Sequence, residues 1–255
     1  MAQYYTDFSK TALGEWTSRW ALQTNSIEDD PAATGGKYMR ISNATNSRNA
    51  VSWDRIPAAK DVEVYARLRH NVPSGSNRNL NWITVRGGGA ASTETGRVSG
   101  LWWSQAFGNP IYARGFSLQN GVNTVLWENL NTSGIVADEW FRSRVQVTGD
   151  TFRVKFWLDG DLEPAAWERT ITNTDNNLPG WIGLGGFNAG EYDYDVFSVG
   201  TEGDPAPTGP VDEYRFRYDP YLFSAAELTG IPTLSAPGVI DITATSARPQ
   251  VTLTY

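Results

Sequence analysis

Apolar and polar residues alternate with a period of two along much of the chain. In residues 141–148, Phe, Ser and two Val residues alternate with two Arg residues, Gln and Thr, and residues 152–156 repeat the alternation. This period is typical of β-strands that place one face on a core. The Thr-Gly-Asp-Thr sequence at 148–151 supplies turn residues, so the two segments together predict an antiparallel hairpin.

Strand-like segments of this kind recur from the N-terminus to about residue 200, with breaks at Gly, Asn and Pro. Residues 62–69 are a second clear example, in which four apolar residues alternate with Glu, Tyr and two Arg residues. Residues 220–228 are the one short helix candidate. Many short strands separated by turn residues predict an all-β fold, an antiparallel jelly-roll sandwich.

The composition of the chain changes after Gly200. Residues 201–210 are rich in Pro and Gly and predict a linker between a jelly-roll domain at 1–200 and an assembly segment at 211–255. This segment is short for an independent core and ends in two strand-like runs. Because two strands cannot satisfy their own edges, they either fold back on the sandwich or join a sheet of another chain, and we favour another chain. The residues expected to mediate this assembly are Val239, Ile240, Ile242, Val251, Leu253 and Tyr255.

Charge and residue usage exclude several classes of function. The chain has 255 residues, a formal net charge of -7 and no basic cluster, which argues against nucleic acid as a partner. It has no Cys and a single His, which removes disulfides, thiolate metal sites and multi-His metal sites. No apolar run approaches the length of a membrane span and no secretory signal begins the chain, so we expect neither membrane insertion nor secretion.

Aromatic residues are in excess, with 11 Trp, 11 Tyr and 10 Phe. The adjacent residues Trp102 and Trp103 must occupy opposite faces of a strand, so one can enter the core while the other faces outward. Sugar rings stack on indole, while Asn, Gln and Arg side chains hydrogen-bond sugar hydroxyls. The candidate ligand-binding residues are Trp82, Trp102, Trp103, Gln105, Asn109, Tyr112 and Arg114. A Trp-rich core is the alternative explanation for any one of the tryptophans.

Three carboxylates occupy alternate positions after Trp157, namely Asp159, Asp161 and Glu163. Oxygen ligands suit Ca²⁺, so calcium is the one candidate cofactor. The segment lacks the length and the Gly placement of an EF-hand loop, and Asp-Gly is also an ordinary hairpin turn that needs no metal. The sequence therefore leaves a calcium site and a metal-free turn as two alternatives.

Several segments together resemble the concanavalin A-like lectin/glucanase superfamily, including its laminin-G-like branch. The resemblance covers about residues 3–200 and implies a two-sheet sandwich; laminin-G-like relatives often bind calcium on a rim. It is carried by the order of strands and turns in Gly36-Lys-Tyr-Met-Arg-Ile, Asp61-Val-Glu-Val-Tyr-Ala-Arg-Leu-Arg, the segment 140–157, Gly180-Trp-Ile-Gly-Leu and Tyr194-Asp-Val-Phe-Ser-Val.

The glucanases of this superfamily carry a Glu-x-Asp-x-x-Glu motif, and the nearest match here is Glu191-Tyr-Asp193-Tyr-Asp195. Retaining hydrolysis needs two carboxyl groups about 5–5.5 Å apart, and alternate strand positions share a face. The second Glu is missing, however, and the resemblance places this run on the last strand rather than the catalytic strand. We therefore predict no catalytic residues and interpret the run as a solvated strand face.

The start of the chain, with a leading strand followed by Gly14-Glu-Trp-Thr-Ser-Arg-Trp, and the tail at 232–255 also resemble tailed-bacteriophage virion proteins. This resemblance implies a fibre, spike or tail-tip adhesin that is assembled in the host cytoplasm and binds a host surface glycan. We accordingly predict a non-catalytic, oligomeric, carbohydrate-binding virion protein whose residues 211–255 contact other virion proteins. A structural decoration or adaptor protein without glycan binding is the first alternative, and a glycoside hydrolase is the second.

Overall fold

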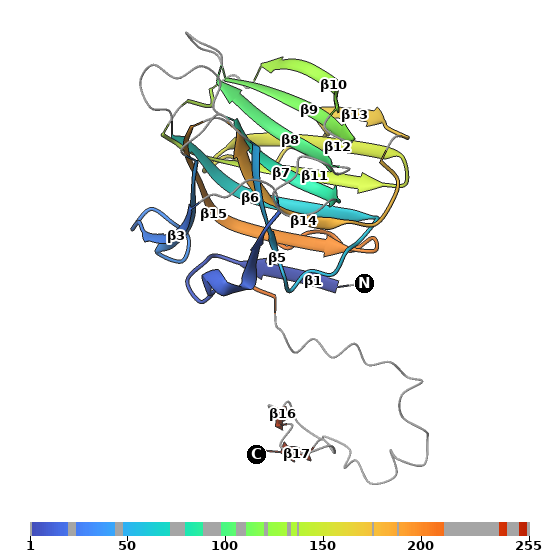
Figure 1. Ribbon diagram of the computed structural model, residues 1–255. Helices are drawn as coiled ribbons and strands as arrows, with labels where there is room; N and C mark the ends of the chain where they lie inside the picture. Colours follow the sequence, from blue (N-terminus) through green and yellow to red (C-terminus); the bar gives the residue numbers. More distant parts are fainter. Residues whose placement is uncertain are drawn as a thin grey trace. The chain divides into compact units, whose positions relative to one another are not determined.

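The computed structural model divides the chain into two compact units, Met1–Val211 and Asp212–Tyr255. The residues that the structure describes are 2–19, 24–43, 48–71, 80–88, 98–105, 111–119, 122–131, 134–136, 138–174, 176–187, 189–211, 240–243 and 250–253. The first unit consists almost entirely of antiparallel strands in two stacked sheets (Figure 1). The predicted all-β jelly-roll sandwich is confirmed.

The first sheet contains eight strands. Its path runs through β13 (Arg169–Thr172), β12 (Thr151–Leu158), β11 (Trp140–Thr148), β6 (Val62–Asn71), β15 (Gly190–Thr201), β4 (Lys37–Asn43) and β3 (Thr24–Asp29). Strand β15 is long enough to have two neighbours on one side. Its first half pairs with β4, and its second half pairs with the N-terminal strand β1 (Ala2–Thr6).

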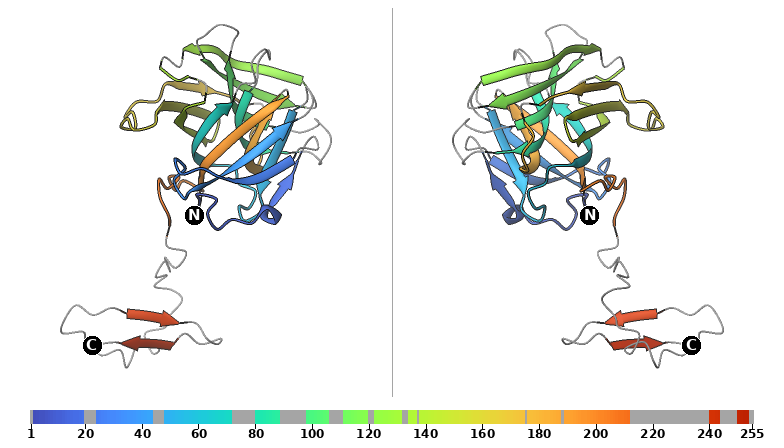
Figure 2. Two further views of the ribbon diagram at one scale, coloured as in Figure 1. Left: turned by 90° about the vertical axis from the view of Figure 1, so that its left-hand side faces the viewer. Right: turned by 90° about the vertical axis from the view of Figure 1, so that its right-hand side faces the viewer.

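The second sheet contains seven strands. Its path runs through β10 (Val122–Asn131), β9 (Ile111–Gln119), β8 (Val98–Gln105), β7 (Leu80–Gly87), β14 (Trp181–Phe187), β5 (Arg48–Trp53) and β2 (Trp16–Ser18). A short 3₁₀ helix, η1 (Leu13–Glu15), precedes β2. Seen from two sides, strands β8–β10 and strands β11–β12 lie in opposite layers (Figure 2). Within the residues described, no helix is long and apolar enough to cross a membrane.

The alternation seen in the sequence decides which side chains enter the space between the sheets. On β6 the apolar residues Val62, Val64, Ala66 and Leu68 belong to the core. The β11–β12 hairpin forms as predicted, with Val145 opposite Val154 and a turn through Gly149, whose φ is 54°. Glycine suits that left-handed conformation because it has no Cβ to clash.

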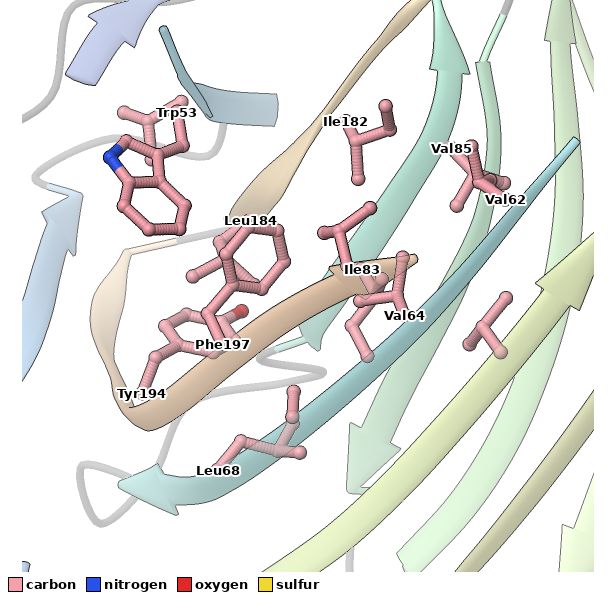
Figure 3. Packing of buried hydrophobic residues seen from close by; sticks show 14 of the residues in the cluster. Trp53, Val62, Val64, Leu68, Ile83, Val85, Ile182, Leu184, Tyr194 and Phe197 are labelled. Atoms are coloured by element: carbon pink, nitrogen blue, oxygen red, sulfur yellow. The ribbon is translucent and has the colours of Figure 1, made fainter. Parts of the chain in front are cut away.

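Aromatic side chains fill much of the core, so a large part of the Trp excess is structural. Trp16 stacks on Trp53 at 5.8 Å between ring centroids. Tyr194 extends from the first sheet toward the second (Figure 3), where its hydroxyl donates to the Gly185 carbonyl at 2.5 Å and accepts from the Trp82 N–H at 3.1 Å. Burial raises the pKa of Tyr194 above its ordinary value, so the hydroxyl remains protonated and joins the two sheets.

The Pro/Gly-rich segment predicted as a linker packs against the first sheet as part of the first unit. Ala206 is buried; its N–H donates to Glu63 at 3.2 Å and its carbonyl accepts from Arg144 at 3.0 Å. The Pro207 carbonyl accepts from the Ser198 hydroxyl at 2.5 Å. Residues 201–210 thus precede the boundary between the two units and pack on the first, because Pro/Gly composition disfavours regular structure without preventing contacts to side chains.

In the second unit, the described residues form β16 (Ile240–Thr243) and β17 (Gln250–Leu253), which pair with each other. The register places Ile240 opposite Leu253 and Ile242 opposite Val251, so four of the predicted assembly residues occupy facing positions in one hairpin. Val239, Tyr255 and the helix candidate at 220–228 lie outside the described residues.

Candidate functional site

Six of the seven predicted ligand-binding residues lie on three neighbouring strands of the second sheet. Strand β7 carries Trp82, strand β8 carries Trp102, Trp103 and Gln105, and strand β9 carries Tyr112 and Arg114. These strands are adjacent in the order β7-β8-β9. Asn109 lies outside the described residues.

The strand register places Trp82, Trp102 and Arg114 in one row across the sheet. Trp102 pairs with Trp82 on one side and with Arg114 on the other. Trp103 pairs with Ala113, whose methyl group lies in the core. Because neighbouring strand residues alternate in direction, Arg114 faces away from the core and Trp102 shares its row. The prediction that Trp102 and Trp103 occupy opposite faces agrees with this register.

The same alternation assigns two further candidates. Tyr112 is two residues from Arg114 and therefore occupies a position on the outer face of β9. Gln105 is two residues from Trp103 and therefore occupies a position on the core side of β8. The register thus separates Gln105 from the outer-face candidates.

Trp82 does not offer an open surface for a sugar ring. Its side chain is 1% exposed, and its indole lies across Gly185 of β14, where an added Cβ would overlap the indole nitrogen. The part of the outer face over β7 and β14 is therefore closed around this tryptophan. Trp82 faces away from the core, but it is buried.

The outer face reaches solvent farther along the sheet, toward the edge strand β10. Arg114 is partly exposed, and Val125, which pairs with Phe116 of β9, is 43% exposed. We call the outer face at Trp102, Tyr112, Arg114 and Val125 the β8–β10 surface. A partly exposed cation near an exposed apolar side chain is a combination expected at a ligand-binding surface.

The outer face of the first sheet is closed by buried ion pairs. Asp193 of β15 is 0% exposed and lies between Arg40 of β4 and Arg69 of β6. It accepts hydrogen bonds from Arg40 at 2.8 and 3.0 Å and from Arg69 at 3.2 and 2.9 Å. Hydrogen bonding to Asp193 raises the pKa of Arg40 above its ordinary value, which keeps the guanidinium protonated.

A second carboxylate, Asp195, fixes the loop at residues 30–36 over this face. It is also 0% exposed, accepts from the Thr34 N–H at 2.8 Å and the Thr34 hydroxyl at 2.7 Å, and pairs with Arg67. The Arg67 guanidinium lies 4.8 Å from the ring centroid of Trp140, which is itself buried. These contacts leave the centre of the face inaccessible.

Asp193 and Asp195, the two aspartates of the segment that most resembles the glucanase motif, are therefore structural. The sequence predicted a solvated strand face here, and that interpretation was wrong because the register places arginines from neighbouring strands against Asp193. Each carboxylate is occupied by cationic or hydrogen-bonding partners and sealed from water, so neither is placed to attack a sugar or to protonate a leaving group.

The calcium site predicted at Asp159, Asp161 and Glu163 is not formed by these residues. Asp159 pairs with Arg67 at 2.7 Å, Glu163 pairs with Arg144 at 2.7 Å, and Asp161 is exposed. Burial alone would raise the pKa values of Asp159 and Glu163, but hydrogen bonds from arginines lower both below their usual range. No group of three acidic or His residues that could hold a metal occurs in the described part of the chain.

Comparisons with known proteins extend these observations. The sequence matches no protein-family model and gives no significant match among curated proteins. Similar solved structures include a glycoside hydrolase family 16 endo-glucanase from Bacteroides ovatus, with a TM-score of 0.55 and 8% identity over 77% of this chain and 99% of that chain. Carbohydrate-binding module CBM66 from Bacillus subtilis has a TM-score of 0.50 and 13% identity over 73% and 96% of the two chains.

The exoplasmic/lumenal domain of VIP36 in a Ca²⁺/Man-bound form is also similar, with a TM-score of 0.50 and 12% identity over 82% of this chain and 97% of that chain. At these identities the similarity establishes the fold. The protein therefore has a concanavalin A-like sandwich fold, similar to that of the endo-glucanase, the carbohydrate-binding module and the VIP36 domain named above.

Proposed function

We propose that the protein is a non-catalytic carbohydrate-binding protein that binds a glycan on the β8–β10 surface. The observation that supports this proposal is the register of β8 and β9, in which Trp102 is opposite Arg114 and Tyr112 is two positions from Arg114 along β9, next to the end of the sheet where Arg114 reaches solvent. An aromatic ring beside hydrogen-bonding groups is the usual way in which proteins hold a sugar.

Two further observations support this choice of surface and the absence of catalysis. The opposite outer face, on the first sheet, is closed by the ion pairs of Asp193 and Asp195. The fold is also one in which a carbohydrate-binding module and a Ca²⁺/Man-bound domain occur, which makes glycan binding a function that this architecture accommodates.

A glycan array followed by calorimetry with the best ligand tests the proposal. Trp102→Ala should weaken binding about 10-fold or more, because a stacked ring loses its platform. Trp167→Ala is the matched control, because Trp167 is only partly buried and lies beside Lys155 of the first sheet. Thermal unfolding of both variants separates loss of binding from loss of fold. Absence of glycan binding, or equal binding by wild type and Trp102→Ala, would refute the proposal.

We further propose that residues 212–255 attach the sandwich to another protein, as in a component of a virion that binds a host surface glycan. Within the described residues of this unit, β16 and β17 pair only with each other, and an isolated two-stranded hairpin is marginally stable. Another chain would supply the packing that the hairpin lacks. Deleting residues 212–255 should abolish co-assembly with other virion proteins and leave glycan binding intact. Co-assembly that survives the deletion would contradict the proposed attachment role of these residues.

The principal alternative is a structural protein that holds virion subunits together without binding a glycan. The β16–β17 hairpin is as compatible with this structural function as with a glycan-binding adhesin. The glycan array distinguishes the two, because a purely structural protein would bind no glycan and would still lose co-assembly when 212–255 is deleted.

A further inference from the structure

We propose that two copies of this chain exchange their Pro-rich segments, so that residues 204–207 of each copy bind the sandwich of the other copy. We call residues 204–207 the strap. The inference concerns self-association of the sandwich and does not depend on glycan binding. It rests on two features of the structure, which are the side chains that receive the strap and the turn that precedes it.

The strap lies on an aromatic cluster on the outer face of the first sheet. The members of this cluster on the sheet are Tyr5, Tyr65, Trp157 and Val196, and Ala206 of the strap is buried against them. The rings of Tyr65 and Trp157 are 6.0 Å apart between centroids. Aromatic surfaces of this kind bind Pro-rich segments in several peptide-recognition domains. The cluster and the strap are therefore related as a receptor surface and its bound peptide within one chain.

Side chains of the sheet satisfy the backbone of the strap. Proline has no N–H, so Ala206 carries the one backbone donor in residues 205–207, and it donates to Glu63 at 3.2 Å. The three carbonyl groups of residues 205–207 accept, in chain order, from the side chains of Gln3, Arg144 and Ser198 at 2.8, 3.0 and 2.5 Å. These partners all lie on strands of the first sheet, so the sandwich of a second copy offers the same contacts to an incoming strap.

A strained turn connects strand β15 to the strap. The Asp204 N–H donates to the Thr201 carbonyl at 3.2 Å, and φ is 55° at Glu202 and 91° at Gly203. Two positive φ values in a turn of this length define type I′, which favours Asn-Gly or Asp-Gly. Most other residues are resisted there, because their Cβ approaches the following carbonyl oxygen. The closed turn is therefore strained at Glu202, and opening the turn removes that strain.

Exchange alters the turn and conserves the contacts of the strap. In the dimer each strap occupies an identical cluster on the other copy, so the strap contacts of the two states balance. The strain of the turn then favours the dimer, and the freedom lost on association favours the monomer. A short hinge under strain is the feature that promotes exchange of a segment between copies. The residues at positions 202 and 203 therefore set the population of the dimer.

Light scattering after size-exclusion chromatography of the full chain, over a range of concentrations, measures this dimer. Gly203→Val should lower the dissociation constant of the dimer about 10- to 100-fold, because a β-branched residue resists positive φ and each dimer opens two turns. Glu202→Asn should raise it about 5-fold or more, because Asn suits the closed turn. Gly209→Val is the matched control and should leave the mass unchanged, because Gly209 has open space around it and no positive φ.

Adding Ala206→Arg to Gly203→Val tests whether the dimer forms through the strap. Arginine does not fit the buried position of Ala206, so the double variant should return to the monomer, and thermal unfolding shows that it is folded. Copies that carry two different tags should co-purify after mixing when they contain Gly203→Val alone. Equal masses for the wild type and Gly203→Val, or a dimer that persists in the double variant, would overturn strap exchange and leave the proposed glycan binding standing.

Discussion

Replacing Asp193 by Asn tests whether ion pairs hold the outer face of the first sheet closed. Asn has nearly the same shape as Asp, so the change removes the negative charge and keeps the packing. Asp193 accepts four hydrogen bonds from Arg40 and Arg69 and is 0% exposed. The substitution therefore leaves two guanidinium groups facing a neutral amide.

The magnitude follows from the partners that the two arginines retain. Removing one partner of a buried ion pair costs about 3–5 kcal/mol. Arg40 keeps Glu191 at 2.9 Å and Arg69 keeps Asp30 at 3.0 Å, and both arginine side chains have some contact with water. We therefore expect the free energy of unfolding to fall by about 3 kcal/mol, toward the lower end of that range. For a domain of this size the melting temperature should fall by about 6–12 °C.

Urea unfolding followed by tryptophan fluorescence measures this change in the full chain, because all 11 Trp residues lie before residue 182 and report on the sandwich alone. Asp161→Asn is the control, since Asp161 is exposed, and it should change stability by no more than about 0.5 kcal/mol. A loss of less than about 1 kcal/mol in Asp193→Asn would refute the argument that charge pairing stabilises this face.

Three further predictions concern the packing and the pH dependence of the sandwich. Gly185→Ala should destabilise the fold by about 1–3 kcal/mol in urea unfolding, because a Cβ would overlap an indole and a backbone carbonyl, whereas Gly209→Ala, with open space around it, should be neutral. A chain ending at residue 200 should be about 3 kcal/mol less stable than one ending at 211, because buried polar groups lose partners; equal melting temperatures would contradict this. Although burial opposes ionisation of Asp159, hydrogen bonds from arginines lower its pKa in the folded protein. The ionised carboxylate therefore stabilises the fold fully above the unfolded pKa of about 3.9, and this stabilisation is lost as the pH falls through the lower pKa of the folded state. The free energy of unfolding below about pH 4 should consequently decline less in Asp159→Asn than in the wild type.

Local sequence was sufficient to predict the strands and their inner faces. The period of two on β6 and on the β11–β12 hairpin is a short-range property, and burial of one face follows from it directly. The same reasoning placed Trp102 and Trp103 on opposite faces, because adjacent strand residues must alternate. Identifying β8 and β9 as carrying the candidate ligand residues also required only this local pattern.

What local sequence could not determine is which residues from distant strands lie opposite one another. Asp193 was predicted to be solvated, yet it lies between Arg40 and Arg69, which are more than 120 residues away along the chain. Trp82 was a candidate ligand-binding residue, yet it is buried. Its indole occupies space that a side chain at Gly185 on the neighbouring strand would fill. Cross-strand register is set by the packing of the whole sandwich, so burial, charge pairing and access to solvent on its outer faces depend on tertiary structure.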